Sequence, residues 1–266
     1  MKELALNHLP ELAPRTVESL NLLRLRLEQT APDAKIILLT STTPQEGKTT
    51  LALQFWQLLA GLGQRCLLVD GDLRHSGICR QCGLTGEHKV PGLAHYLSGS
   101  VPLEEVLYHT EIRGTCLVPA SGTTSRPALL LEHPRFARMV ESCAPKFAYL
   151  LVDAPALSEC SDALSLAKVC DGALLVVQSG GVTHQELRQA AHLLQGCGLP
   201  LGLEHDGRIG GGLRRALRLG CRVFLHQRCR AEAGAAARTG KPGAAQGLWQ
   251  GQGKVCRMAG RAQAEK

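Results

Sequence analysis

Residues 40–50 are Thr40-Ser41-Thr42-Thr43-Pro44-Gln45-Glu46-Gly47-Lys48-Thr49-Thr50. This stretch follows a short apolar run at 36–39 and precedes a helix-like segment, 48–62, with apolar residues on one face. A Gly-Lys-Thr sequence between a strand and a helix is the setting of a phosphate-binding loop, whose backbone N–H groups attract anions. The alternative is a polar turn that happens to contain Gly-Lys-Thr, and the strand–loop–helix order argues against it.

Three more apolar runs are typical of buried parallel strands, at 66–69, 149–152 and 173–177. Helix-like stretches are expected at 102–109, 132–143, 161–170 and 183–196, besides one within the first 34 residues. Thr183 and Glu186 at the start of the last stretch form a capping-box pattern. Strands that are apolar throughout and alternate with amphipathic helices predict an α/β fold with a doubly wound, mostly parallel sheet. Together with the loop at 40–50, this sheet is expected to be of the P-loop NTPase type.

Acidic residues stand where two of these runs end. Asp70 and Asp72 follow the run at 66–69, and Asp153 follows the run at 149–152. Any one of them could simply cap a helix. In an open α/β sheet, however, ligands bind beyond the carboxyl ends of the strands, so we expect all three carboxylates to converge on the loop that contains Lys48.

Composition excludes several classes of protein. Aromatic residues make up 3% of the 266 residues, too few for the stacking platforms of single-strand nucleic-acid binders. No apolar run approaches the ~18 residues of a membrane span. Eleven cysteines at irregular spacing indicate a reducing compartment rather than a disulfide framework. Cys79 and Cys82 have metal or redox spacing, but no second pair accompanies them, so we expect them to be structural.

The loop, the Asp70-x-Asp72-x-Arg74 segment and the Asp153-x-Pro155 segment together resemble the bacterial tyrosine kinases of capsule and exopolysaccharide synthesis. The resemblance extends over residues 17–203. It implies an ATP-dependent protein-tyrosine (auto)kinase that requires Mg²⁺ and regulates capsular or exopolysaccharide synthesis or export.

The resemblance also implies a role for each residue of the site. Lys48 would reach the β- and γ-phosphates, and the nucleotide would lie against Thr43, Pro44, Gln45, Glu46, Gly47, Lys48, Thr49 and Thr50. The metal would be held by Thr49, Asp72 and Asp153. Asp70 would accept the tyrosine proton with Asp72 as second choice, and Arg74 would orient both acids; Lys48 and Asp153 complete the catalytic set.

Several positions depart from the family pattern. Thr42 replaces the first glycine of the phosphate-loop motif, Gln45 stands at another position where glycine is common, and Asn21 replaces an arginine associated with ring assembly. No tyrosine follows Tyr149, so the C-terminal cluster that members autophosphorylate is absent, and we expect Tyr96, Tyr108 and Tyr149 to be packing residues.

Two other functions remain open. One is a partition-type ATPase switch, although Thr43 stands where that class has its signature lysine. The other is a catalytically weak, nucleotide-sensing scaffold. For the kinase, the expected partner is a membrane adaptor or polysaccharide co-polymerase, a homo-oligomer is allowed, and no specific nucleic acid is expected. The expected location is cytoplasmic, peripheral to the inner face of the plasma membrane.

The net charge of +7 belongs to the end of the chain. Residues 1–203 contain 17 Lys and Arg against 19 Asp and Glu, whereas residues 204–266 contain 13 against 4. We expect a lead-in and helix at 1–34, a P-loop kinase domain at 35–203, and a disordered or frameshifted Gly/Ala/Arg-rich tail at 204–266. A frameshift near residue 203 would leave the sheet edge beside 173–177 open; a natural basic tail is the alternative.

Overall fold

The computed structural model describes residues 2–84, 90–121, 124, 126–178 and 180–199, and the backbone of 221–227. The chain divides into two compact units, Met1–Cys229 and Arg230–Lys266, and the second lies outside the described residues. Most of the predicted tail therefore also lies outside the part of the chain that the structure describes.

The first unit is built on an eight-stranded sheet with the order β1-β4-β5-β3-β6-β2-β7-β8. The strands are β1 (Lys2–Leu4), β2 (Ile36–Ser41), β3 (Cys66–Asp70), β4 (Tyr108–Thr110), β5 (Thr115–Val118), β6 (Tyr149–Asp153), β7 (Gly172–Gln178) and β8 (Cys221–Gln227). Neighbouring strands are parallel except in the β4–β5 and β7–β8 pairs, which are antiparallel. The predicted mostly parallel α/β sheet is confirmed.

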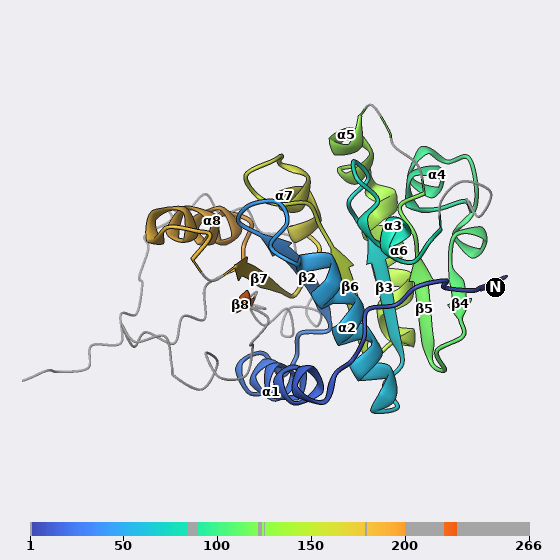
Figure 1. Ribbon diagram of the computed structural model, residues 1–266. Helices are drawn as coiled ribbons and strands as arrows, with labels where there is room; N and C mark the ends of the chain where they lie inside the picture. The colour runs from blue at the N-terminus through green and yellow to red at the C-terminus, as the bar shows by residue number, and fades with distance from the viewer. Residues whose placement is uncertain are drawn as a thin grey trace, which may run out of the picture. The chain divides into compact units, whose positions relative to one another are not determined.

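Helices cover both faces of this sheet (Figure 1). They are α1 (Pro14–Thr30), α2 (Lys48–Gly61), α3 (Gly77–Gln81), α4 (Leu93–Ser98), α5 (Pro127–Leu131), α6 (Pro134–Cys143), α7 (Asp162–Ala167) and α8 (His184–Gly196), with 3₁₀ turns η2 (Leu103–Glu105) and η3 (Ala144–Lys146). Strand residues alternate between two cores: Ile37 and Leu39 pack with α1 and α2, and Leu38 packs with the residues of α6 and α7. This alternation follows from the two-residue period of a strand.

The four apolar runs form β2, β3, β6 and β7 as predicted. The capping box of α8 is also confirmed, because the Thr183 N–H donates to Glu186 Oε2 at 2.8 Å and the Glu186 N–H donates to Thr183 Oγ1 at 3.2 Å. The predicted helix at 102–109 is wrong: only the short turn η2 forms, followed by β4. Tyr108 and Thr110 are both buried with exposed His109 between them, which is the pattern of a strand.

The expectation of an open sheet edge beside β7 is also wrong. β8 pairs antiparallel with β7 over its whole length, from Gly172 with Gln227 to Gln178 with Cys221. The segment 221–227 includes Val223, Phe224 and Leu225 at its centre. These are residues that favour strands, within a region whose overall composition is dominated by Gly, Ala and Arg. Whether residues 204–266 arise from a frameshift stays a prediction.

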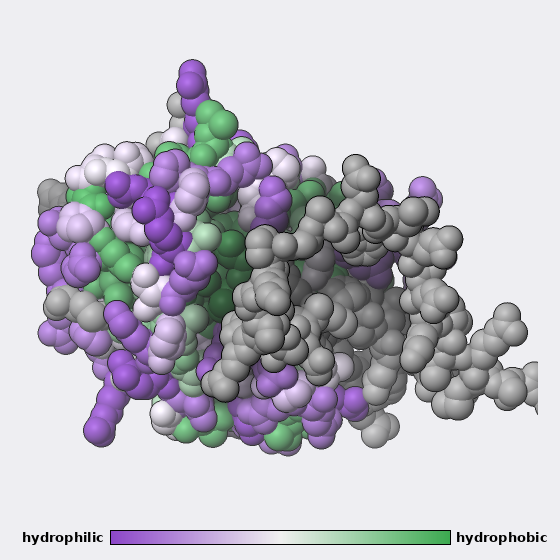
Figure 2. Space-filling model, turned by 180° about the vertical axis from the view of Figure 1, so that it is seen from behind, coloured by the Kyte–Doolittle hydropathy of each residue, from purple (hydrophilic) through white to green (hydrophobic). Residues whose placement is uncertain are grey.

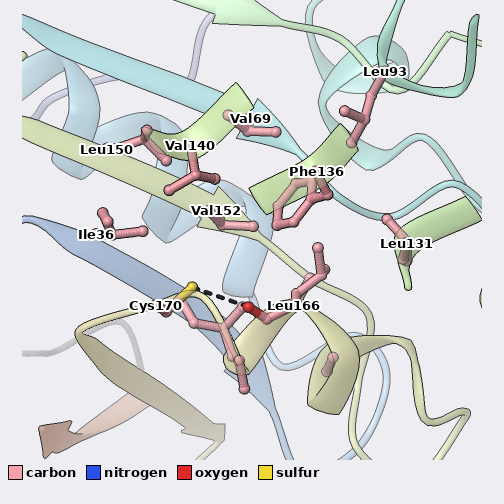
Figure 3. Packing of buried hydrophobic residues seen from close by; sticks show 14 of the residues in the cluster. Ile36, Val69, Leu93, Leu131, Phe136, Val140, Leu150, Val152, Leu166 and Cys170 are labelled. Carbon is pink, nitrogen blue, oxygen red and sulfur yellow. Dashed lines mark hydrogen bonds between the residues drawn. The ribbon is translucent and has the colours of Figure 1, made fainter. Parts of the chain in front are cut away.

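Helix α6 supplies much of the core on its side of the sheet (Figure 3). Its Phe136 and Val140 lie among Leu131, Val152 and Leu166, and Phe136 is 1% exposed.

Hydrophilic residues cover much of the described surface on the side opposite to that of Figure 1 (Figure 2). A few large apolar side chains remain exposed, among them Leu129 of α5 at 63%.

We expect Phe136→Ala to lower the free energy of unfolding by about 3–5 kcal/mol, because it removes a large buried side chain and leaves a cavity. The matched control is Leu129→Ala, which removes an exposed side chain and should change that free energy by less than about 0.5 kcal/mol. Urea denaturation followed by circular dichroism measures both variants. Equal effects of the two substitutions would contradict the placement of α6.

Candidate active site

The carboxyl ends of β2, β6 and β3 meet at one edge of the sheet, because the three strands are adjacent and parallel (Figure 1). Asp70 and Asp153 are Cα partners in the register of β3 with β6, and Asp153 also pairs with Leu39 of β2. The loop that contains Lys48 leaves β2 at this same edge. The structure therefore brings together the loop and the strand-end acids, as the sequence predicts.

The loop turns into α2 through a left-handed backbone. Gly47 caps the helix with a φ of 85°, and Lys48 is the first helical residue. Gln45 also has a left-handed φ, 64°, which explains why glycine is favoured at this position. Thr42 is not among the residues with positive φ, so the absence of glycine there requires no strained backbone. Thr50 Oγ1 accepts a hydrogen bond from Gln81 Nε2 at 3.0 Å.

Glu46 has a role that its position in the motif does not reveal. It is 3% exposed, and its carboxylate accepts the Thr43 N–H at 2.7 Å and the Gln178 N–H at 2.9 Å. The Thr43 N–H therefore already has a partner within the protein. The Thr43 N–H, which was expected to contact phosphate, therefore helps to shape the loop instead.

Asp153 is completely buried, and neither of its carboxylate oxygens has a hydrogen-bond partner among the described residues. Burial raises the pKa of this carboxyl to about 7, while the charge of Lys48 and the nearby Thr49 hydroxyl act to lower it. A buried carboxylate without hydrogen bonds is costly unless another group satisfies it. The site therefore has unused capacity to bind a cation.

These groups fit Mg²⁺, which prefers oxygen ligands and binds through one or two protein oxygens together with phosphate oxygens. Asp153 supplies open carboxylate oxygens, and the Thr49 hydroxyl lies close to it. Within the described ranges, no group of three or more His, Cys, Asp and Glu side chains has metal-binding geometry. A metal shared with a polyphosphate is compatible with the site.

Asp70 is equally buried but fully hydrogen-bonded. Its Oδ1 accepts the Asp72 N–H at 3.3 Å and its Oδ2 accepts the Ile78 N–H at 3.2 Å. Burial raises the pKa of Asp70 well above the usual aspartate value, and the charges of Asp153 and Asp72 raise it further. Asp70 is therefore both an anchor for the loop after β3 and a carboxylate that binds protons strongly.

Asp72 is 3% exposed and organises the same loop. Its Oδ1 accepts the backbone N–H groups of Arg74, at 3.2 Å, and His75, at 3.0 Å. Its Oδ2 lies 3.2 Å from Nδ1 of the His75 ring. Because both oxygens are engaged, Asp72 has less capacity for a metal than Asp153 has.

The expectation that Arg74 orients Asp70 and Asp72 is wrong for its side chain, although its backbone N–H donates to Asp72. The Arg74 guanidinium forms two hydrogen bonds with the buried carboxylate of Asp162, at 2.7 and 3.1 Å. Asp162 begins α7, so the pair joins the loop after β3 to that helix. The Asp70-x-Asp72-x-Arg74 segment does not predict the contact of Arg74 with Asp162, because the two residues are 88 positions apart in the sequence.

Two glycines allow close approach at this edge. A Cβ on Gly71 would lie 2.8 Å from the Asp153 carbonyl oxygen, and the Gly71 N–H donates to that oxygen at 2.8 Å. A Cβ on Gly77 would lie 3.0 Å from Thr49 Oγ1. The loop after β3 therefore packs directly against both β6 and the start of α2.

The Cys79 and Cys82 pair lies in and just after α3, and both thiols are buried. Burial raises the pKa of Cys79 to about 11 and that of Cys82 to about 12, so neither forms a thiolate readily. These properties support the expected structural role.

The three tyrosines are buried or half-buried, which supports their expected packing role. Their hydroxyls donate hydrogen bonds to the Arg135 carbonyl (Tyr96, 3.3 Å), the Pro91 carbonyl (Tyr108, 3.0 Å) and Glu28 Oε1 (Tyr149, 3.5 Å). None of the three hydroxyls is therefore freely exposed to accept a phosphoryl group.

Known proteins with similar sequences are tyrosine kinases and polysaccharide transport proteins. Over 186 residues the chain is 31% identical to tyrosine-protein kinase CpsD of Streptococcus agalactiae serotype III (strain NEM316), covering 70% of this chain and 79% of that protein. Over 163 residues it is 30% identical to the succinoglycan biosynthesis transport protein ExoP of Rhizobium meliloti (strain 1021), covering 60% of this chain and 20% of that protein. No protein-family profile matches the chain.

Solved structures give the same result. The kinase domain of Escherichia coli tyrosine kinase ETK superposes with a TM-score of 0.64 at 25% identity, covering 69% of this chain and 71% of that one. The VpsO kinase domain superposes with a TM-score of 0.62 at 28% identity, covering 69% of this chain and 89% of that one. The fold and the loop with its strand-end acids define a P-loop protein-tyrosine kinase. The chain belongs to the bacterial tyrosine kinase family of capsular and exopolysaccharide synthesis.

The raised pKa of Asp153 has a consequence for stability. The folded protein keeps this proton up to about pH 7, whereas the unfolded chain releases it near the ordinary aspartate value. The free energy of unfolding should therefore fall as the pH rises through this window, because the folded state binds more protons there than the unfolded state.

Asp153→Asn, which stays neutral, should show a smaller fall and be more stable than the wild type at pH 8. Urea denaturation between pH 5 and 8 measures this, with exposed Asp33→Asn as the matched control. Identical pH slopes for the wild type and Asp153→Asn would contradict the assigned environment of Asp153.

Proposed function

We propose that this chain transfers the γ-phosphoryl group of ATP, with Mg²⁺, to protein tyrosines at the edge where β2, β6 and β3 end. The observation that carries the proposal is the pair of unpartnered, buried Asp153 oxygens beside Lys48 and Thr49. Family membership supplies the reaction, and the site supplies groups of the required chemistry.

The proposed roles follow from position. Lys48 and the N–H groups at the start of α2 bind the phosphates, because the positive end of a 14-residue helix favours anions. Thr49 and Asp153 hold Mg²⁺, which when bound neutralises charge on the phosphates. Phosphoryl transfer requires positioning and electrostatic stabilisation more than covalent chemistry, so a preformed loop between a strand and a helix suits it.

For the proton of the acceptor tyrosine, Asp70 is the proposed base. Burial and the nearby charges of Asp153 and Asp72 raise its pKa, so its carboxylate binds a proton more strongly than an exposed aspartate does. Asp72 is the second choice. Its two bonds from backbone N–H groups fix the loop over which a tyrosine would approach.

The proposed partner is a membrane adaptor or polysaccharide co-polymerase, and the proposed location is the inner face of the plasma membrane. The support is the similarity to ExoP, which is named a transport protein and is much longer than the matched segment. Among the helices that the structure describes, none is long and apolar enough to cross a bilayer.

Lys48→Met should abolish tyrosine phosphorylation while leaving the free energy of unfolding within about 0.5 kcal/mol of the wild type, because Lys48 is half-buried and belongs to neither hydrophobic core cluster. The assay incubates the chain with Mg·ATP and a tyrosine-containing acidic polymer and detects phosphotyrosine. Exposed Lys146→Met is the matched control and should retain activity. Phosphotyrosine formation by Lys48→Met would contradict the site, and ATP hydrolysis without phosphotyrosine in the wild type would favour the ATPase switch.

The acceptor tyrosine is proposed to lie outside residues 1–266, because the three tyrosine hydroxyls are hydrogen-bonded within the fold. After incubation with Mg·ATP and the polymer, mass spectrometry should find phosphate on the polymer and none on peptides that contain Tyr96, Tyr108 or Tyr149. Phosphate on one of these peptides at a level similar to that of the polymer would contradict this proposal.

A further inference from the structure

The Glu46 carboxylate joins two segments that are distant in the sequence. Through its Oε2 it holds the N–H of Thr43, at the start of the phosphate-binding loop, and through its Oε1 it holds the N–H of Gln178, at the end of β7. Since β7 pairs with β2 in parallel, the two bonds tie the loop to the strand beside it (Figure 1).

The charge of Glu46 is unexpected in this place. A loop that binds phosphate would be better served by a neutral side chain, because a nearby carboxylate repels anions. Burying the carboxylate adds a desolvation cost that only hydrogen bonds offset. Bonds from N–H groups to a carboxylate are stronger than those to a neutral oxygen, so a geometric role accounts for both the burial and the charge.

The bond from Thr43 to Glu46 also spans Gln45, the loop residue with left-handed φ. Left-handed backbone is unfavourable for a residue with a Cβ and persists where the surroundings impose it. By fixing the backbone on both sides of Gln45, the Glu46 carboxylate can maintain a conformation that glycine would adopt without help.

We infer that Glu46 is a positioning residue of the phosphate-binding loop. Its carboxylate ties the loop to the end of β7 and holds Gln45 in the left-handed conformation, so that the loop N–H groups face the phosphates before ATP arrives. The inference rests on the proposed function, since it concerns the affinity of that same site for ATP.

Glu46→Gln tests the inference, because glutamine keeps the size but offers only one oxygen for two N–H donors. The KM for ATP should rise about tenfold while kcat stays within about twofold, as the loss of one bond to a charged group implies. A fluorescent ATP analogue should bind about tenfold more weakly at equilibrium. The matched control is Glu141→Gln on the exposed side of α6, which should change neither value.

The role of Gln45 is tested by a double-mutant cycle. With Gln45→Gly present, Glu46→Gln should raise the KM by only about threefold or less, since glycine adopts the left-handed backbone without support. Urea denaturation of each variant shows whether the fold is retained. An equal effect of Glu46→Gln in both backgrounds would overturn the link to Gln45.

Three other results would overturn the inference. A lower KM in Glu46→Gln would mean that repulsion of phosphate outweighs any positioning. A fall in kcat and stability with KM unchanged would indicate a merely structural residue. Equal analogue binding by the wild type and Glu46→Gln would remove the effect altogether. If the wild type itself bound no ATP analogue, the proposed function would fail, and the inference with it.

Discussion

Two carboxylates, Asp70 and Asp153, are buried as register partners at the ends of adjacent parallel strands, and the rest of the site is arranged around this constraint. Like charges at close range in a low dielectric repel, and burial disfavours both. Backbone N–H groups satisfy Asp70, whereas Asp153 remains without a hydrogen-bond partner in the described part of the chain. Because only Asp70 is hydrogen-bonded, Asp70 anchors the loop after β3, whereas the Asp153 carboxylate is available to a cation.

The surrounding segments hold this arrangement through contacts that link different elements. Arg74 joins the loop after β3 to the start of α7 through buried Asp162. Glu46 joins the phosphate-binding loop to the end of β7. Gly71 permits the backbone after β3 to reach the Asp153 carbonyl. Each contact uses a polar group that is costly to bury alone, and together they keep the loops in place before any substrate binds.

The departures from the kinase pattern have different structural consequences. Thr42 has no positive φ, so its replacement of glycine leaves the backbone unstrained. Gln45 has a left-handed φ, so the replacement there does carry strain, which the neighbouring Glu46 contact can support. The hydroxyls of Tyr96, Tyr108 and Tyr149 are each hydrogen-bonded within the fold.

The sequence by itself determined the four central strands, their order relative to the main helices, and the convergence of Lys48, Asp70 and Asp153, because these depend on apolar periodicity and on residues at strand ends. Only the tertiary structure decided that 108–110 is a strand and that 221–227 covers the edge of β7, since such short segments gain their stability from neighbours. It also decided the partners of Arg74 and Glu46. Asp162 lies 88 residues from Arg74 and Gln178 lies 132 residues from Glu46, and spacing along a chain carries no information about contacts that only the packing of the sheet creates.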